Sequence, residues 1–466
     1  MTDSLINLID SLDKKDPWVF AIVTAVIGAL IWELLKSLYY QVWGKTHEIK
    51  YIQKILIEAG ELIETGKYDV SLETYNRIIT SRNKKYYPLL YSKAQIAIGN
   101  VYQKIADIKQ DEDSYKTAIN YYKYGLEVLS EKEHTYINRA FQNKFKYPGD
   151  FIKAKIELAK AYAGLSVIRS KEENLIQAIH ETTDILTTFP DNLTSSAEAV
   201  IKNNLGTYYG ELSEYQDKEK NLQIAISYLE QASNYYKTDS SKQKENFETK
   251  FNLAHLLMLL SASSKDIKQL HRAIDRYNLL LSGIEKINNR SSYYSVVNDA
   301  LGTAYVELAL LNQQNIETTI EKALHAFEES LKYTSRERKT EIARIKQNQA
   351  RAYIELSKIN DPENNIVIAI NLLNDALQTY TITEYPYLHA RTQITKCVAI
   401  NNIIDLIPDI SSKMRLLNYA HVSLCDAKSI FTLDKFPEQN KKIESLIPII
   451  NTKIIFPLIP YSKRTS

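Results

Sequence analysis

Apolar residues along most of the chain recur with the period of an amphipathic helix, in stripes that come in pairs. In one stretch Ile201, Leu205 and Leu212 mark the first stripe, and Leu222 and Leu229 belong to the next. The polar segment 211–221 between them suits a turn. The pattern predicts two helices that form a hairpin. A single hairpin cannot bury its apolar face, so neighbouring hairpins must stack.

The same pattern returns along the chain at a nearly constant interval. A second signature, an Ala followed by a large apolar residue, comes 16 residues after five of the six first-helix anchors and 18 after the other. Self-similarity with such a period is typical of repeat proteins. The anchors are Tyr102, Tyr162, Tyr209, Leu257, Tyr305 and Tyr353, and the second-helix alanines are Ala118, Ala178, Ala225, Ala273, Ala323 and Ala369.

These residues resemble the tetratricopeptide repeat, whose motif carries Leu-Gly-x-x-Tyr on one helix and spaced small residues on the next. Leu205, Gly206, Tyr209, Ala225 and Ala232 match it in order. The departure is a longer unit of about 48 residues, with 19 residues between Gly206 and Ala225 where the usual motif has 12. The resemblance implies an all-α, right-handed α-solenoid of helical hairpins, which we expect over residues 47–430, with Tyr209 packed inside.

An uncharged apolar run, residues 17–32, precedes the repeats and carries Trp18 and Trp32 near its two ends. Aromatic residues at both ends are typical of membrane helices. We therefore expect a transmembrane helix over 17–43, after an acidic tail over 1–16. More Lys residues follow the run than precede it, which favours a single-pass membrane protein with a cytoplasmic repeat domain. The alternative is a helix buried in protein, because the run is short for a bilayer.

Small residues form a stripe on this segment, at Ala21, Ala25 and Ala29. Such a stripe lets two membrane helices approach closely. It predicts a homo-oligomer formed through the transmembrane helix, although Ala is common in helices of this kind.

The last part of the chain, residues 431–466, is expected to be a cap and tail. Its apolar stretch 441–460 must be covered, either by the last repeat or by contact with lipid or a partner. Pro448, Pro457 and Pro460 are expected to end any long helix there.

Composition narrows the function. The chain of 466 residues has a formal net charge of +2, which does not indicate the strongly basic surface that binds nucleic acid. Its 12 Gly and 11 Pro argue against a loop-rich or all-β fold. Cys397 and Cys425 are too few for a disulfide framework. The basic run 336–346 contains interleaved acids and is interpreted as a salt-bridged helix surface.

Residues with catalytic or metal-binding spacing are missing from the sequence. We therefore expect no enzyme, no metal and no cofactor. In the tetratricopeptide family the first helices line a concave groove that binds extended peptides or chain ends. Lys and Asn at such places resemble a clamp for a carboxylate, and a solvated polar face is the alternative. By alignment the candidate contacts are Lys153, Lys160, Asn203, Asn204, Thr207, Asn252, His255, Asn348 and Arg351.

The function that these observations favour is a membrane-anchored scaffold or adaptor that binds another protein or a peptide in its groove and also contacts the lipid bilayer. The alternative is a sensor-effector that oligomerises through the transmembrane helix to perturb the membrane, as in bacterial stress or antiviral defence systems.

Overall fold

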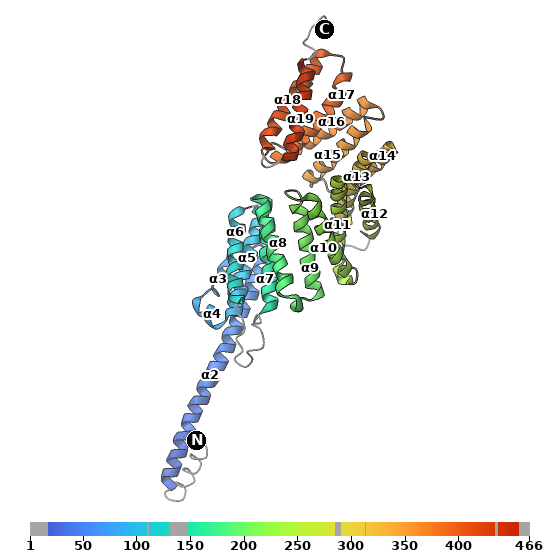
Figure 1. Cartoon of the computed structure of the whole chain (residues 1–466). Coiled ribbons are helices and arrows are strands. Elements are labelled where there is room, and N and C mark those ends of the chain that lie inside the picture. Colours follow the sequence, from blue (N-terminus) through green and yellow to red (C-terminus); the bar gives the residue numbers. More distant parts are fainter. Residues whose placement is uncertain are drawn as a thin grey trace. The chain divides into compact units, whose positions relative to one another are not determined.

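The computed structural model describes residues 17–109, 111–130, 147–284, 290–312, 314–433 and 437–455. Helices and their connecting turns make up these residues, and no strand occurs among them. The predicted all-α fold is therefore confirmed for the described part of the chain (Figure 1). The chain divides into two compact units, residues 1–192 and 193–466, which we call the first and the second unit.

The first unit begins with a long helix, followed by two short helices and two helical hairpins, α5 with α6 and α7 with α8. The acidic tail expected over 1–16 and the segment 131–146 lie outside the described residues. The elements are α2 (Pro17–Glu64), α3 (Tyr68–Asn76), α4 (Ser81–Tyr86), α5 (Pro88–Lys109), α6 (Glu112–Leu129), α7 (Pro148–Ile168), α8 (Lys171–Thr188) and η1 (Pro190–Asn192).

The second unit holds five hairpins and a final helix. The first helices of these hairpins begin at residues 195, 243, 290, 339 and 386, at intervals of 48, 47, 49 and 47 residues. The elements are α9 (Ser195–Leu212), α10 (Lys218–Tyr236), η2 (Ser240–Lys242), α11 (Gln243–Ser264), α12 (Ile267–Gly283), α13 (Arg290–Leu311), α14 (Ile316–Tyr333), α15 (Lys339–Leu356), α16 (Pro362–Thr379), α17 (Pro386–Ile403), η4 (Ile404–Leu406), α18 (Ile410–Ile430) and α19 (Pro437–Ile455).

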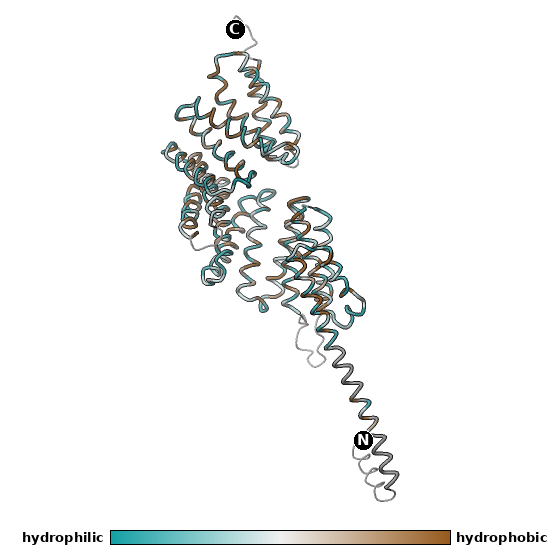
Figure 2. Tube along the Cα trace, turned by 180° about the vertical axis from the view of Figure 1, so that it is seen from behind, coloured by the Kyte–Doolittle hydropathy of each residue, from teal (hydrophilic) through white to brown (hydrophobic). Residues whose placement is uncertain are grey.

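Small residues set the distance between the two helices of a hairpin. A Cβ atom added to Gly206 on α9 would lie 2.6 Å from Leu229 on α10, and one added to Gly302 on α13 would lie 2.7 Å from Phe327 on α14. Ala225 is fully buried, as are the five other alanines of the second-helix signature. Small residues thus allow the two helices of a hairpin to pack closely. Figure 2 shows hydrophobic and hydrophilic stretches alternating along these helices.

The anchor tyrosine is less central than expected. Tyr209 is only partly buried and stacks on Tyr228, with ring centroids 6.0 Å apart, whereas its neighbour Tyr208 is buried. The buried face of α9 therefore includes residues 205 and 208 rather than Tyr209. Gly206 lies on this face and allows it to approach α10 closely.

A left-handed residue stands at the turn of five hairpins, just before the second helix. These residues are Ser170, Asp217, Lys265, Asn315 and Asp361, with φ between 39° and 55°. Such a conformation ends one helix and reverses the chain within a few residues. None of the five is Gly, so composition alone did not reveal these turns.

The membrane localisation expected from the sequence is contradicted. Among the described residues, none of the helices combines the length and the apolar character that crossing a membrane requires. The physical reason is the length of the apolar run: 17–32 provides 16 residues, against about 20 for a bilayer core, and Glu33 and Lys36 follow it. The transmembrane helix, the single-pass topology and the lipid partner are therefore corrected.

The small-residue stripe loses its basis with the span. Residues 17–43 belong to the longer helix α2, where Ala29 is exposed, and the side chains of Ala21 and Ala25 lie outside the described residues. The sensor-effector alternative, which required clustering of membrane helices, loses its structural premise as well.

The final helix also corrects a prediction. Pro448 does not end it, because α19 continues through this residue to Ile455. Ile443 and Ile450 of α19 are buried in a cluster with Cys397 of α17 and Leu424 of α18. Within the described residues the apolar stretch thus packs on the last hairpin, which compensates for the backbone hydrogen bond that Pro removes.

Candidate functional site

The first helices line the inner side of the second unit. Consecutive first helices contact each other, as α13 does with α15 and α15 with α17. Among the described residues, consecutive second helices make no contact of comparable extent. Helices that approach one another more closely lie on the inside of a curved stack. Polar side chains on these helices are therefore candidates for ligand contacts.

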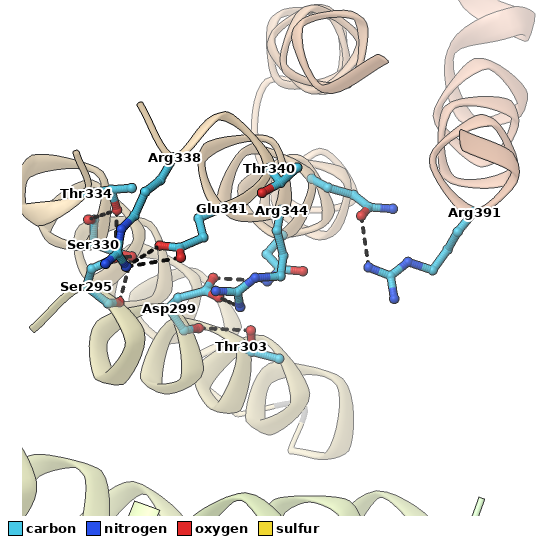
Figure 3. Close-up of polar contacts among 12 residues, drawn as sticks. Ser295, Asp299, Thr303, Ser330, Thr334, Arg338, Thr340, Glu341, Arg344 and Arg391 are labelled. Atoms are coloured by element: carbon cyan, nitrogen blue, oxygen red, sulfur yellow. Dashed lines mark hydrogen bonds and ion pairs between the residues drawn. The ribbon is translucent and has the colours of Figure 1, made fainter. Parts of the chain in front are cut away.

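A stripe of polar residues on α15 faces the preceding first helix, α13. Arg344, Asn348 and Arg351 recur at helical spacing and so share one face. Arg344 forms an ion pair with Asp299, and Arg351 reaches Glu307 with 2.9 Å between Nη2 and Oε1. Figure 3 shows Arg344 directed at Asp299 across the two helices.

Asp299 is the most buried charge in this cluster, with a residue exposure of 1%. Its Oδ1 accepts a hydrogen bond from Nδ2 of Asn348 at 3.0 Å, and its Oδ2 faces Arg344. Burial raises the pKa of Asp299, and the positive charge of Arg344 and the hydrogen bond from Asn348 act in the opposite direction. Asp299 therefore holds Arg344 and Asn348 in place rather than facing solvent.

Two further cations come from the next helices, and neither forms an ion pair with a described residue. Arg391 on α17 donates from Nη2 to Oε1 of Gln347 at 3.1 Å (Figure 3), and Lys442 lies on α19. We call Arg344, Arg351, Arg391 and Lys442 the basic groove. Their charges interact, because Arg351 lowers the pKa of both Arg391 and Lys442 after the larger effect of burial.

Three side chains on this face are accessible to water although burial still affects their charges. Arg391, Lys442 and His255 of α11 are all exposed to water. Burial nevertheless lowers the pKa of each, so each is surrounded by protein that removes part of its hydration. Arg344 lowers the pKa of His255 further, although the two residues lie two hairpins apart.

Two small cavities open on this face. One of about 200 Å³ is lined by Arg351, Glu355, Thr395 and Lys442 together with apolar residues of α13, α15 and α17. The other, of about 190 Å³, is lined by Thr207 of α9 and by Asn252 and His255 of α11, and also by Glu211 and Glu214. Three residues that the sequence singled out are thus brought together in the second cavity, and a fourth, Arg351, lies in the first.

The remaining predicted contacts have other surroundings. Asn203 accepts a hydrogen bond from the Thr249 hydroxyl at 2.8 Å, and Nδ2 of Asn204 is buried without a partner among the described residues. Lys160 pairs with Glu157 at 2.9 Å, and Lys153 is exposed. Both lysines lie on α7 of the first unit, whereas the seven other candidates lie in the second.

The sequence analysis missed three residues that define the groove. Arg391 and Lys442 fall beyond the clear repeats, where no motif marks the inner face. Arg344 belonged to the basic run interpreted as a salt-bridged surface. That interpretation holds for Arg338, which pairs with Glu341 on its own helix at 3.1 Å, but Arg344 pairs with another helix. Its i, i+7 spacing to Arg351 was the available signal.

Groups that could perform chemistry do not gather in the described residues. No set of three or more His, Cys, Asp or Glu side chains there could hold a metal ion. Cys397 is buried and Cys425 is exposed, and neither is in a disulfide. Burial raises the pKa of the Cys397 thiol to about 12, which suits packing rather than nucleophilic attack.

Comparisons with known proteins give only distant likenesses. No family model and no curated protein matches the chain. Among solved structures it is similar to the apo form of the quorum sensor NprR from B. thuringiensis, with 10% identity, a TM-score of 0.46, and coverage of 86% of this chain and 99% of that one.

Two further structures are similar to the same degree. A Rap protein complexed with Competence and Sporulation Factor has 12% identity and a TM-score of 0.42, with coverage of 87% of this chain and 99% of that one. NprR in complex with its cognate peptide NprX has 12% identity and a TM-score of 0.41, with coverage of 86% and 98%. Since these scores lie below 0.5, the TPR-like repeat architecture rests on the hairpins of this chain itself.

Proposed function

We propose that this chain is a non-catalytic, TPR-like scaffold that binds an acidic segment of a partner protein or peptide along the inner face of its second unit. The observation that carries the proposal is the pair Arg391 and Lys442, which lack a carboxylate partner among the described residues although nearby protein removes part of their hydration. Partly desolvated cations are costly, and an anionic ligand relieves that cost.

The geometry of the groove suits an extended chain. Arg344 and Arg351 come from α15, Arg391 from the next first helix, α17, and Lys442 from α19, so the cations span three helices of the stack. The partly exposed side-chain amide of Asn348 lies between Arg344 and Arg351, and its Oδ1 can accept a hydrogen bond from a peptide backbone. Cations give the affinity for acidic side chains or a chain end, and the amide gives the register.

The second cavity extends this proposal to predicted residues. Thr207, Asn252 and His255 lie further along the same inner face, Arg351 belongs to the basic groove, and Asn348 shares the partner Asp299 with Arg344. We propose that these five contact the bound segment. Lys153 and Lys160 of the first unit, Asn203 and Asn204 stay predictions, as do the domain boundaries at residues 47 and 430.

The test is a peptide-binding experiment on the full chain. A random library of free twelve-residue peptides is screened, and the best binder is measured by fluorescence polarisation against the wild type, Arg391→Gln and Lys442→Gln. The control variant is Lys332→Gln, which removes an exposed cation of the second helix α14. We expect binders rich in Asp and Glu, and about tenfold weaker binding for each groove variant. Binding that is equal in all variants, or a screen that enriches no acidic peptide, would refute the proposal.

A further inference from the structure

A third cavity of the second unit lies outside the basic groove and shares no residue with it. It has a volume of about 520 Å³, within the range of sites that hold small ligands. It lies where α10 ends, α11 begins and α12 ends. Three cations line it, Lys237, Lys250 and Arg276, and none of the described residues that line it is acidic.

The charges around this cavity are not balanced by the described residues. Lys237 and Lys250 form no ion pair there, and Arg276 shares Glu230 with Arg272, at 3.8 Å and 3.2 Å. Burial lowers the pKa of Lys250, and Lys237 and Arg276 lower it further. The charged groups that shift Lys250 are thus cations alone. Such a cluster repels itself until an anion enters.

Part of this positive charge has a structural use. Lys237 is the C-terminal cap of α10, where a cation offsets the free carbonyl groups of the helix end. Lys250, the eighth residue of α11, has no such use, and no described side chain caps the N-terminus of α11. The field of that helix end also favours an anion.

The uncharged residues that line the cavity indicate which kind of ligand it can hold besides an anionic group. Leu279 lines the cavity and is 70% exposed, while Phe247 and Leu280 form its buried wall. Oδ1 of Asn246 is buried and lacks a donor among the described residues. The cavity thus offers apolar surface and a hydrogen-bond acceptor beside its cations.

We propose that this cavity binds a small organic phosphate whose partly apolar body carries a hydrogen-bond donor. Lys250, Arg276 and Lys237 hold the phosphate, Leu279 and Phe247 contact the body, and Asn246 accepts its donor. A phosphate is preferred to a carboxylate because one phosphate group carries about two negative charges at neutral pH, against one for a carboxylate. The site is independent of the peptide groove, and nothing in the proposed scaffold function requires it.

Isothermal titration calorimetry on the full chain tests this site, with ADP, glucose 6-phosphate, pyrophosphate and citrate as probes. We expect ADP or glucose 6-phosphate to bind with a Kd below about 1 mM, and more tightly than pyrophosphate, which lacks a body. Lys250→Gln should weaken that binding about tenfold. Lys244→Gln, which removes an exposed cation from the same helix, should leave it unchanged.

Several outcomes overturn the proposal. These are no binding by either organic phosphate, pyrophosphate binding as tight as theirs, citrate binding alone, or equal affinity in Lys250→Gln and the wild type. Circular dichroism establishes that both variants are folded, and Lys237→Gln, at an exposed position, is a second variant if Lys250→Gln is not.

Discussion

Removing the charge of Arg344 should destabilise the second unit in a pH-dependent way. Arg344→Met keeps the length of the side chain but leaves the Asp299 carboxylate buried, with Asn348 as its remaining side-chain partner. Breaking one side of a buried ion pair costs about 3–5 kcal/mol. Since the Arg344 side chain is 41% exposed, solvent already screens the pair. We therefore expect a loss of about 2 kcal/mol at pH values near 8.

The sign of the pH dependence follows from the pKa of Asp299. Burial raises this pKa in the folded chain above its ordinary value. A group of this kind contributes its full stability below its unfolded pKa of about 4, and loses it as the pH rises through the folded pKa. Without Arg344 the folded pKa rises further, at about 1.4 kcal/mol per pH unit. The cost of Arg344→Met should therefore be small near pH 5 and largest near pH 8.

The assay is urea unfolding of the full chain, followed by far-ultraviolet circular dichroism near pH 5 and pH 8. Asp299→Asn on its own should cost little, and the double variant should lose less stability near pH 8 than Arg344→Met does, because no buried charge is left. Equal destabilisation at both pH values, or additive effects in the double variant, would refute this account of the Asp299 environment.

Three further predictions concern packing. Gly206→Ala should cost about 1–2 kcal/mol, because its Cβ would meet Leu229 at 2.6 Å, whereas Gly149→Ala, with no atom within 4 Å, should be neutral or slightly stabilising; equal melting temperatures would contradict this. In urea unfolding, Tyr277→Phe should be neutral or stabilising by about 1 kcal/mol, since the buried Tyr277 hydroxyl has no partner among the described residues. Tyr122→Phe should cost about 1–2 kcal/mol, because it loses hydrogen bonds to Asn100 and Gln103. The reverse order of stability would contradict these assignments. A thiol reagent should label the exposed Cys425 quickly and the buried Cys397 only after unfolding, and rapid labelling of both in the native protein would show that the last hairpin is not packed as described.

The apolar period and the spaced small residues were enough to predict helical hairpins, because close packing leaves few alternatives. Small residues such as Gly206 and Ala225 are required at the positions where two helices touch. These positions recur at fixed intervals, so the sequence itself shows their spacing. The same local pattern could not separate Tyr208 from Tyr209, since a small rotation of one helix exchanges them. The same pattern led to the wrong prediction of a membrane helix at residues 17–32, because apolar character alone does not distinguish a helix covered by lipid from one covered by protein.

The groove and the cavity were decided by tertiary structure. Arg344 could be recognised as basic from the sequence, but only the approach of α13 and α15 gives it Asp299 as a partner. Arg391 and Lys442 are 51 residues apart in the chain and meet the same arginine only because consecutive hairpins stack. Lys237, Lys250 and Arg276 converge for the same reason. Helical periodicity is a local property that the sequence by itself determines, whereas the charges that share a hollow depend on how the helices pack, which no local pattern records.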